Sequence, residues 1–147
     1  MEDLSFYLGR AYYNYVVYLQ NLLRRFKLQD VLQPGMGAIL FFLFETDDCI
    51  IKDLAERLEL APSTLTALLR RMEKAKVITC RRCAEDGRAV RVKLTARGRG
   101  LEPRCRELSA ALNVQMVRGF GAGEVQALKQ SLAQVVKNIR AGIEHTP

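Results

Sequence analysis

Apolar and polar residues follow a helical period along the first half of the chain. Residues 4 to about 29 carry an apolar side chain at every third or fourth position, which predicts a long amphipathic helix. The run AILFFLF at 38–44 is apolar on all sides and predicts a buried second helix, with Pro34 suited to its first turn. Two shorter helices are predicted from CIIKDLAERLEL, which begins with a short extra element, and from PSTLTALLRRMEKAK.

The period changes to two between residues 77 and 94. The runs VITCRRC and RAVRVKL are rich in β-forming residues and are joined by the polar turn AEDG, which predicts a β-hairpin. On the second strand we expect Val90, Val92 and Leu94 to face inward. The alternate residues Arg91 and Lys93 are expected to face solvent.

A helical period returns after the hairpin. Thr95 suits an N-cap, and the apolar stripe from Leu101 to Met116 predicts a fifth helix, which Pro103 either kinks or moves at its start. Glycines at positions 119, 121 and 123 break the chain before a last amphipathic helix. The pattern therefore predicts a mainly α fold with a small β-hairpin wing: a winged helix-turn-helix flanked by N- and C-terminal dimerisation helices.

The length of 147 residues predicts a single domain, and we divide it into two lobes. Residues 34–106 contain the winged helix-turn-helix and form the predicted DNA-binding lobe. Residues 1–33 and 107–147 form the predicted helical dimerisation lobe, because both outer helices carry heptad-like apolar seams of the kind that associate between subunits. The alternative is that these helices pack only on each other within one subunit.

Positive charge is concentrated in the middle of the chain. The whole chain has a net charge of +7, and residues 51–106 hold 15 Lys or Arg against 7 Asp or Glu, a net charge of +8. The remainder therefore carries a net charge of −1. Such a block is typical of a protein that binds a polyanion. A solvated basic face without a ligand is the alternative, and charge alone does not decide between them.

The helix predicted from residue 62 is the expected DNA-reading element. Its apolar stripe leaves hydroxyl and basic side chains on the other faces: Ser63, Thr64, Thr66, Arg70, Arg71 and Lys74. Short hydroxyl residues approach base edges closely, and arginines reach guanine or phosphate. Ala61 is a poor N-cap, so the first amides of the helix are left for water or phosphate. The alternative is a core helix with an ordinary solvated basic face.

The hairpin favours the nucleic-acid interpretation. It is too small to have its own core, yet it carries five basic residues: Arg81, Arg82, Arg88, Arg91 and Lys93. Its tip, EDGR, is placed to reach a flanking minor groove or phosphates. Double-stranded DNA is therefore the expected partner.

Four short motifs follow one another between residues 51 and 99. They are DLAERL at 53–58, PSTLT at 62–66, DGR at 86–88 and LTARG at 94–98. Their order and spacing resemble the core of the MarR family, the multiple-antibiotic-resistance type regulators, and the flanking helices match in order and length only. The resemblance implies a bacterial or archaeal homodimer that represses transcription from palindromic operators, often relieved by a small aromatic ligand or by oxidation.

The resemblance also implies roles for individual residues. Those that would contact the groove are Ser63, Thr64, Thr66, Arg70 and Arg71. Arg88 would be the wing arginine at the minor groove, and Asp86 would hold that arginine through a charge-assisted hydrogen bond. The chain departs from the family at two positions. Cys80 stands where relatives often have arginine, and Ala61 replaces the usual serine cap.

A ligand pocket is a further expectation from the resemblance. The aromatic residues expected to line it are Tyr12, Tyr13, Tyr15, Phe41 and Phe44, with Arg10 or Arg24 as a carboxylate partner. The alternative, which we favour, is that these aromatic residues are simply core.

The four cysteines, Cys49, Cys80, Cys83 and Cys105, give little support to a metal or a disulfide. Zinc needs about four ligands, and the only histidine is His145 in the C-terminal tail. Residues i and i+3 of an extended strand lie about 10 Å apart, too far for a bridge between Cys80 and Cys83. Cys83, close to basic residues that would lower its pKa, remains a redox candidate, so a thiol-based redox regulator is an alternative function.

The sequence gives little support to an enzyme or to a protein-binding module. The chain lacks a glycine-rich phosphate loop and paired carboxylates, so an enzyme is not expected, and no cofactor is expected. A winged-helix module that binds protein instead of DNA would expose apolar residues on the reading helix, where this chain has Ser, Thr, Arg and Lys. Without a secretory signal or an apolar run long enough for a membrane span, we expect a cytoplasmic, nucleoid-associated protein.

Overall fold

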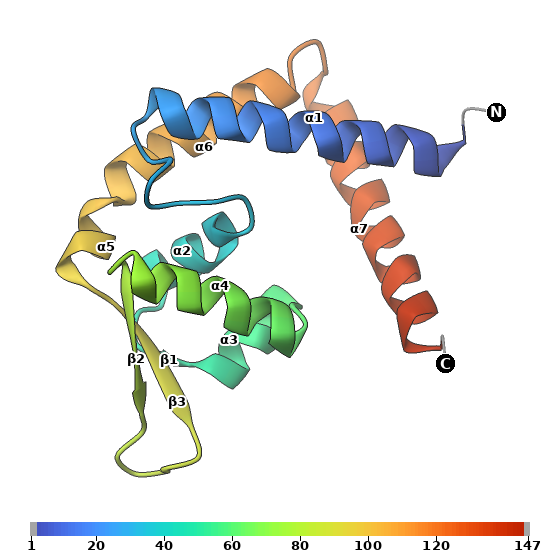
Figure 1. Cartoon of the computed structure of the whole chain (residues 1–147). Coiled ribbons are helices and arrows are strands. Elements are labelled where there is room, and N and C mark those ends of the chain that lie inside the picture. Colours follow the sequence, from blue (N-terminus) through green and yellow to red (C-terminus); the bar gives the residue numbers. More distant parts are fainter. Residues whose placement is uncertain (1–2, 146–147) are drawn as a thin grey trace. The chain divides into compact units, whose positions relative to one another are not determined.

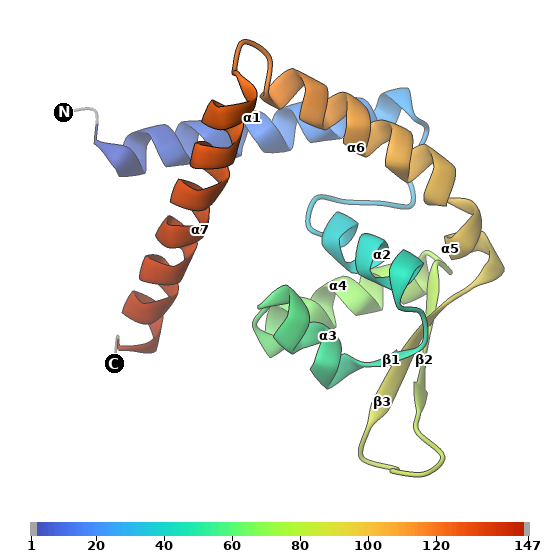
Figure 2. The ribbon, with the colours of Figure 1, turned by 180° about the vertical axis from the view of Figure 1, so that it is seen from behind.

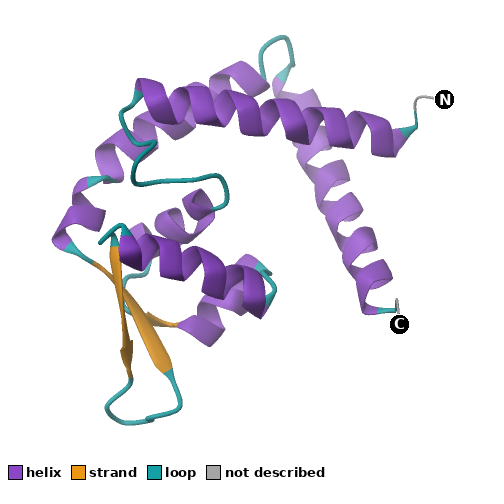
Figure 3. Ribbon diagram, in the orientation of Figure 1, coloured by secondary structure: helices purple, strands orange, loops and turns teal. Residues whose placement is uncertain are grey.

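The computed structural model describes residues 3–145. Within this range the helices and strands are α1 (Leu4–Arg25), α2 (Met36–Glu45), β1 (Cys49–Ile50), α3 (Ile51–Leu58), α4 (Pro62–Lys74), β2 (Ile78–Arg82), β3 (Val90–Leu94), α5 (Ala96–Gly100), α6 (Glu102–Met116) and α7 (Ala122–Glu144) (Figure 3). The chain divides into two compact units, one up to Leu112 and one from Asn113 onward. The mainly α fold with a small β wing is confirmed.

Helix α1 begins at a true N-cap and ends earlier than its sequence pattern predicts. The Asp3 carboxylate accepts a hydrogen bond of 3.0 Å from the backbone N–H of Phe6, which satisfies one of the free amides of the first turn. The helix ends at Arg25 instead of near residue 29. The reason is Lys27, which adopts a positive φ of 56° and turns the chain, while Leu28 is fully buried beyond it.

The start of α2 also differs from expectation. Pro34 lies before the helix, and the N-cap is Gly35 with a φ of 95°, a left-handed conformation that glycine adopts without steric cost. Gly35 also lies against α4, since a Cβ placed on it would be 3.5 Å from a methyl group of Leu68. The prediction that α2 is buried is confirmed, because five of its ten residues are buried.

The winged helix-turn-helix contains a third strand. β1, β3 and β2 form one antiparallel sheet in that order, with Cys49 opposite Val92 and Cys80 opposite Val92 on its other side (Figure 1). The short element expected before α3 is therefore an edge strand of the wing. The inward face of β3 is as predicted: Val92 and Leu94 are buried and Val90 is half-buried.

The base of the wing is fixed to α5. The Thr95 hydroxyl accepts from the backbone N–H of Gly98 at 3.0 Å and donates to the Lys76 carbonyl at 2.7 Å, so the predicted N-cap is confirmed. A Cβ on Gly98 would lie 2.1 Å from the Val77 carbonyl oxygen, so only glycine fits. Pro103 occupies the second position of α6, where it moves the start of the helix without breaking it.

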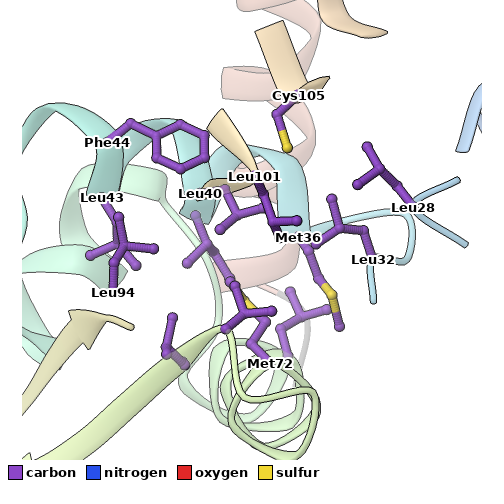
Figure 4. Packing of buried hydrophobic residues seen from close by; sticks show 14 of the residues in the cluster. Leu28, Leu32, Met36, Leu40, Leu43, Phe44, Met72, Leu94, Leu101 and Cys105 are labelled. Atoms are coloured by element: carbon purple, nitrogen blue, oxygen red, sulfur yellow. The ribbon is translucent and has the colours of Figure 1, made fainter. Parts of the chain in front are cut away.

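One apolar core joins the elements of the first unit. Side chains of α2, α4, β3 and the residues before α6 pack together, as Figure 4 shows for Leu40, Leu43, Met72, Leu94 and Leu101. These side chains come from segments far apart in the sequence, so this core holds the reading helix and the wing in one body.

The second unit contains the end of α6 and all of α7. Helix α7 has no buried residue among those described, and its apolar stripe is exposed. In the described part of the chain, neither this helix nor any other has the length and apolarity needed to cross a bilayer. The grouping of residues 1–33 with 107–147 as a dimerisation lobe stays a prediction.

Candidate nucleic-acid interface

Burial fixes which face of α4 meets solvent. Four apolar side chains, Leu65, Leu68, Leu69 and Met72, are at most 8% exposed. Because they recur every three or four residues, they turn the remaining faces outward. The residues predicted to contact DNA from this helix are all exposed: Ser63, Thr64, Thr66, Arg70, Arg71 and Lys74. The structure thus gathers them on the solvent side of one helix.

Among the residues that the structure describes, no side chain caps the N-terminus of α4. Ala61 is the N-cap residue and Pro62 the first helical residue, as the sequence predicts. The amides of the first turn have no acceptor within a helix, so those of Ser63 and Thr64 are open to water or phosphate. Thr66 uses its hydroxyl hydrogen on the Pro62 carbonyl, at 2.8 Å, and keeps its oxygen lone pairs as acceptors.

The two neighbouring arginines of α4 differ in their partners. Arg71 donates from Nη1 to Oε1 of Gln33 at 3.1 Å, across 38 residues of sequence. Among the described residues, no hydrogen bond or ion pair holds Arg70. Arg70 is therefore free to reach a ligand, whereas Arg71 also ties α4 to the connection between α1 and α2. No local sequence pattern indicates this hydrogen bond, because its two residues lie 38 positions apart.

The tip of the wing extends away from the helices of its unit (Figure 2). Asp86 accepts a 3.0 Å hydrogen bond from the backbone N–H of Arg88, and its carbonyl accepts from the N–H of Ala89 at 3.0 Å. The expected bond between the Asp86 carboxylate and the Arg88 guanidinium is absent from the described structure. Asp86 therefore orders the backbone of the turn, because a short carboxylate reaches the amide two residues on, and it leaves the exposed Arg88 side chain free.

One basic residue of the hairpin has a structural partner. The guanidinium of Arg91 donates from Nε to the Asp48 carboxylate at 2.8 Å and also to the Asp48 carbonyl. This hydrogen bond lowers the pKa of Asp48 and raises the pKa of Arg91. Arg91 thus joins the wing to the turn before β1. The other basic side chains of the wing, those of Arg81, Arg82, Arg88 and Lys93, are exposed.

The cysteines of the sheet are separated by its geometry. Cys49 and Cys80 lie on either side of Val92, two strand spacings or about 9.5 Å apart, which is too far for a disulfide. Burial raises the pKa of the Cys80 thiol. Cys83 contacts the Arg91 side chain and contributes to raising its pKa, after Asp48; a redox role for Cys83 stays a prediction. Within residues 3–145 no three His, Cys, Asp or Glu side chains gather as metal ligands.

A cavity of about 290 Å³ lies among α1, α2 and α6. Two of the predicted pocket residues, Tyr15 and Phe41, line it. Tyr12 and Tyr13 do not line it, and they are 68% and 67% exposed. Arg10 does not line it either: its guanidinium carbon lies 5.4 Å from the centroid of the Phe6 ring. A ligand-binding role for Tyr12, Tyr13 and Arg10 stays a prediction.

Phe44 and Arg24 also lie outside this cavity. Phe44 is 8% exposed and packs edge-on against Phe41, with the two ring centroids 5.8 Å apart, so it belongs to the core. Arg24 lines a neighbouring hollow of about 320 Å³. Twelve of the fourteen residues that line the cavity were not predicted from the sequence, among them Gln33, Cys105 and Ser109. They come from segments more than 70 residues apart, and no local pattern joins them.

Comparison with known proteins identifies the relatives of this chain. Residues 32–90 match the MarR family model. The chain is 27% identical over 139 residues to the HTH-type transcriptional repressor IacR of Pseudomonas putida, covering 94% of this chain and 81% of that protein. It is 30% identical over 114 residues to the HTH-type transcriptional regulator SarZ of Staphylococcus aureus, covering 77% of this chain and 71% of that protein.

Comparison with solved structures leads to the same family. A MarR family regulator from Listeria monocytogenes, solved in complex with a 26mer DNA, superposes with a TM-score of 0.75 at 19% identity, over 95% of this chain and 90% of that one. Proteins of this family regulate transcription and are not enzymes. Motifs, fold and relatives agree: the chain belongs to the MarR family of transcriptional regulators.

Proposed function

We propose that this chain binds double-stranded DNA sequence-specifically as a homodimer, represses transcription from palindromic operators, and is released by a small ligand. The observation that carries the proposal is the exposed Ser, Thr, Arg and Lys face of α4 beside a basic hairpin. A helix with this face suits the major groove, and an extended basic tip suits the flanking backbone or minor groove.

The proposed DNA contacts depend on which side chains already have hydrogen-bond partners within the described structure and which do not. Ser63 and Thr64 offer hydroxyls and open amides to a phosphate or base edge, and Thr66 offers an acceptor. Arg70 has no competing partner among the described residues, so it is the proposed reader of guanine. Arg88 is the proposed minor-groove residue, while Lys74, Arg71, Arg81 and Arg82 neutralise phosphates.

Dimerisation is supported by apolar surface in each unit. In α7 the exposed apolar side chains recur at helical spacing: Leu128, Leu132, Val136, Ile139 and Ile143. The first half of α1 exposes Leu4, Phe6 and Tyr7 among others. Exposed apolar patches mark interaction sites, and a second copy would bury them. A two-fold dimer would present its two α4 helices about 34 Å apart, one turn of DNA.

Repression is proposed from the resemblance and from the relative that is named a repressor. Release requires only that a ligand prefer a spacing of the two α4 helices that does not fit DNA. A preference of a few kcal/mol displaces such an equilibrium. The cavity among α1, α2 and α6 supports this part of the proposal, because one of its lining residues, Gln33, accepts the hydrogen bond from Arg71 of α4.

Selection of bound duplexes from a random DNA pool tests the proposal. We expect an inverted repeat with half-sites one helical turn apart, and a dimer by analytical ultracentrifugation. Affinity for the selected site should fall steeply with salt, with a log–log slope of about −0.9 for each neutralised phosphate. The double variant Arg70→Ala, Lys74→Ala should weaken binding, while the matched variant Lys129→Ala, Lys137→Ala on α7 should not. A pool without any enriched sequence, or a slope near zero, contradicts the proposal.

A further inference from the structure

The helix α4 carries a single acidic residue, Glu73, among the basic residues of its exposed face. Its neighbours Arg70 and Lys74 are proposed DNA contacts, and a free carboxylate between them would repel phosphates. The Glu73 carboxylate is engaged elsewhere: its Oε1 accepts a 3.0 Å hydrogen bond from the backbone N–H of Cys80 in β2. Burial, and after it the nearby Glu73 carboxylate, raises the pKa of the Cys80 thiol. The acidic group of the reading helix is therefore directed toward the wing.

The hairpin fixes the direction in which each amide of β2 points. Cys83, which follows β2, donates from its backbone N–H to the Ala89 carbonyl at 2.8 Å. Because backbone groups alternate in direction along a strand, odd-numbered residues of β2 face β3 and the Cys80 amide points to the other side. β2 is an edge strand in the order β1-β3-β2, so the sheet has no strand on that side. In the described structure, the Glu73 carboxylate takes the place of a neighbouring strand at this amide.

This hydrogen bond lies well beyond the base of the wing. Residues 75–77 are all that separates α4 from β2, and the Thr95 hydroxyl holds this connection through the carbonyls of Lys76 and Val77. Cys80 lies three residues further along the strand than Val77, about 10 Å away. A contact at the base alone leaves the strand free to tilt about it. A second contact at Cys80 removes that freedom.

We propose that Glu73 is a positioning residue for DNA recognition: through the backbone of Cys80 it fixes the angle between α4 and the wing, and so determines where Arg88 meets DNA. Glu73 itself touches no DNA. The inference rests on the proposed function and adds to it a residue outside the predicted contacts. Because the bond uses a backbone amide, it does not depend on the side chain at position 80.

The hydrogen bond is tested on the full chain without DNA, by hydrogen exchange of single amides followed by NMR. Glu73→Ala leaves the Cys80 amide on the open side of an edge strand, so its exchange should become at least about tenfold faster. Glu73→Gln keeps an oxygen acceptor and should retain most of the protection. The Thr79 amide, which faces β3, is the internal reference and should not change. An unchanged Cys80 rate in Glu73→Ala, or equal acceleration at both amides, overturns the proposal.

The positioning role is tested by a double-mutant cycle on the selected duplex. Arg88→Ala should weaken binding about fivefold in the wild type but less than about twofold in Glu73→Ala, because a misplaced wing has little contact left to lose. Arg70→Ala is the matched control on the reading helix and should weaken both backgrounds by the same factor. Glu73→Gln should respond to Arg88→Ala as the wild type does. Equal effects of Arg88→Ala in the wild-type and Glu73→Ala backgrounds overturn the positioning role.

Two other roles of Glu73 give different results. A carboxylate that only repels phosphates predicts tighter binding of every duplex by both Glu73→Ala and Glu73→Gln, with a steeper dependence on salt. A carboxylate that reads a base predicts that Glu73→Ala loses preference at one central position of the selected site. Positioning predicts a loss of preference in the flanks alone, as for Arg88→Ala, so either other result overturns it. The exchange measurement needs no DNA, and selection with the wild type tests DNA binding by itself, so failure of either proposal is recognised separately.

Discussion

The helix α4 and the wing both face the proposed DNA, but they are held by different forces. Four side chains of α4 are almost fully removed from solvent, so its orientation is set by the apolar core. The wing tip has no buried side chain between residues 83 and 89. It is shaped by hydrogen bonds that Asp86 accepts from backbone N–H groups and by the pairing of Arg91 with Asp48. The orientation of the reading helix therefore depends on packing, and that of the wing on polar contacts.

This difference matters for DNA reading. A base-reading element must keep its register within the groove, which a close-packed core enforces. A minor-groove element must adapt to the local width of DNA, and a solvated turn can do so. Four predictions separate the two regions, beginning with the one that has the largest expected effect.

Met72→Ala should destabilise the fold most. Met72 is fully buried beneath α4, and replacing a buried methionine with alanine costs about 2–5 kcal/mol. Val90→Ala, at a half-buried position of the wing, should cost clearly less. Chemical denaturation measures both free energies of unfolding. Equal losses would show that the wing is packed as tightly as α4 and would remove the contrast.

Gly98→Ala tests how closely the base of the wing is packed against the start of α5. The new methyl group would meet the Val77 carbonyl at the base of the wing, and such overpacking costs about 1–3 kcal/mol or more. Gly100→Ala is the matched control in the same short helix, because no atom lies within 4 Å of its added Cβ. The control should be neutral or slightly stabilising, since alanine favours helix by about 1 kcal/mol over glycine. Similar melting temperatures for the two variants would contradict the tight contact at Gly98.

Arg70→Ala and Arg88→Ala should affect DNA binding differently. Loss of a base-reading arginine costs about 1–3 kcal/mol and relaxes the sequence preference at one position, which we expect for Arg70. Loss of Arg88 should weaken binding by a smaller amount and alter preference only in the flanks, through groove width. Repeating the DNA selection with each variant measures this. Identical changes in the selected sequences would mean that helix and wing do not divide the work as proposed.

The same contrast explains what the sequence revealed. The buried face of α4, the hairpin and the Thr95 cap follow from local spacing, and the structure confirms them. The bonds from Arg71 to Gln33 and from Arg91 to Asp48 join residues 38 and 43 positions apart, and no periodicity encodes such pairs. Tyr12 and Tyr13 lie outside the cavity, and the sequence could not indicate this for a related reason: an aromatic stripe indicates that a helix face is apolar, but not what covers it.

Asp48→Asn should have the smallest effect, confined to the wing and dependent on pH. Asparagine tolerates the positive φ of 60° at this position, so the change removes charge with little backbone strain. The hydrogen bond from Arg91 lowers the pKa of Asp48 below its usual 3.8. A carboxylate with a depressed pKa stabilises the folded state above its unfolded pKa, and this stabilisation is lost as the pH falls through the folded pKa. The variant should therefore melt at a slightly lower temperature than the wild type at pH 7, and this difference in melting temperature should close below pH 3.8.

The matched control is Asp30→Asn, which removes an exposed carboxylate that has no ion pair in the described structure. It should show no such difference. A difference between Asp48→Asn and wild type that persists in acid would show that the charge of Asp48 is not its source. No difference at pH 7 would show that the backbone carbonyl of Asp48, which the change leaves in place, is enough to hold Arg91, and that the wing is held by geometry more than by charge.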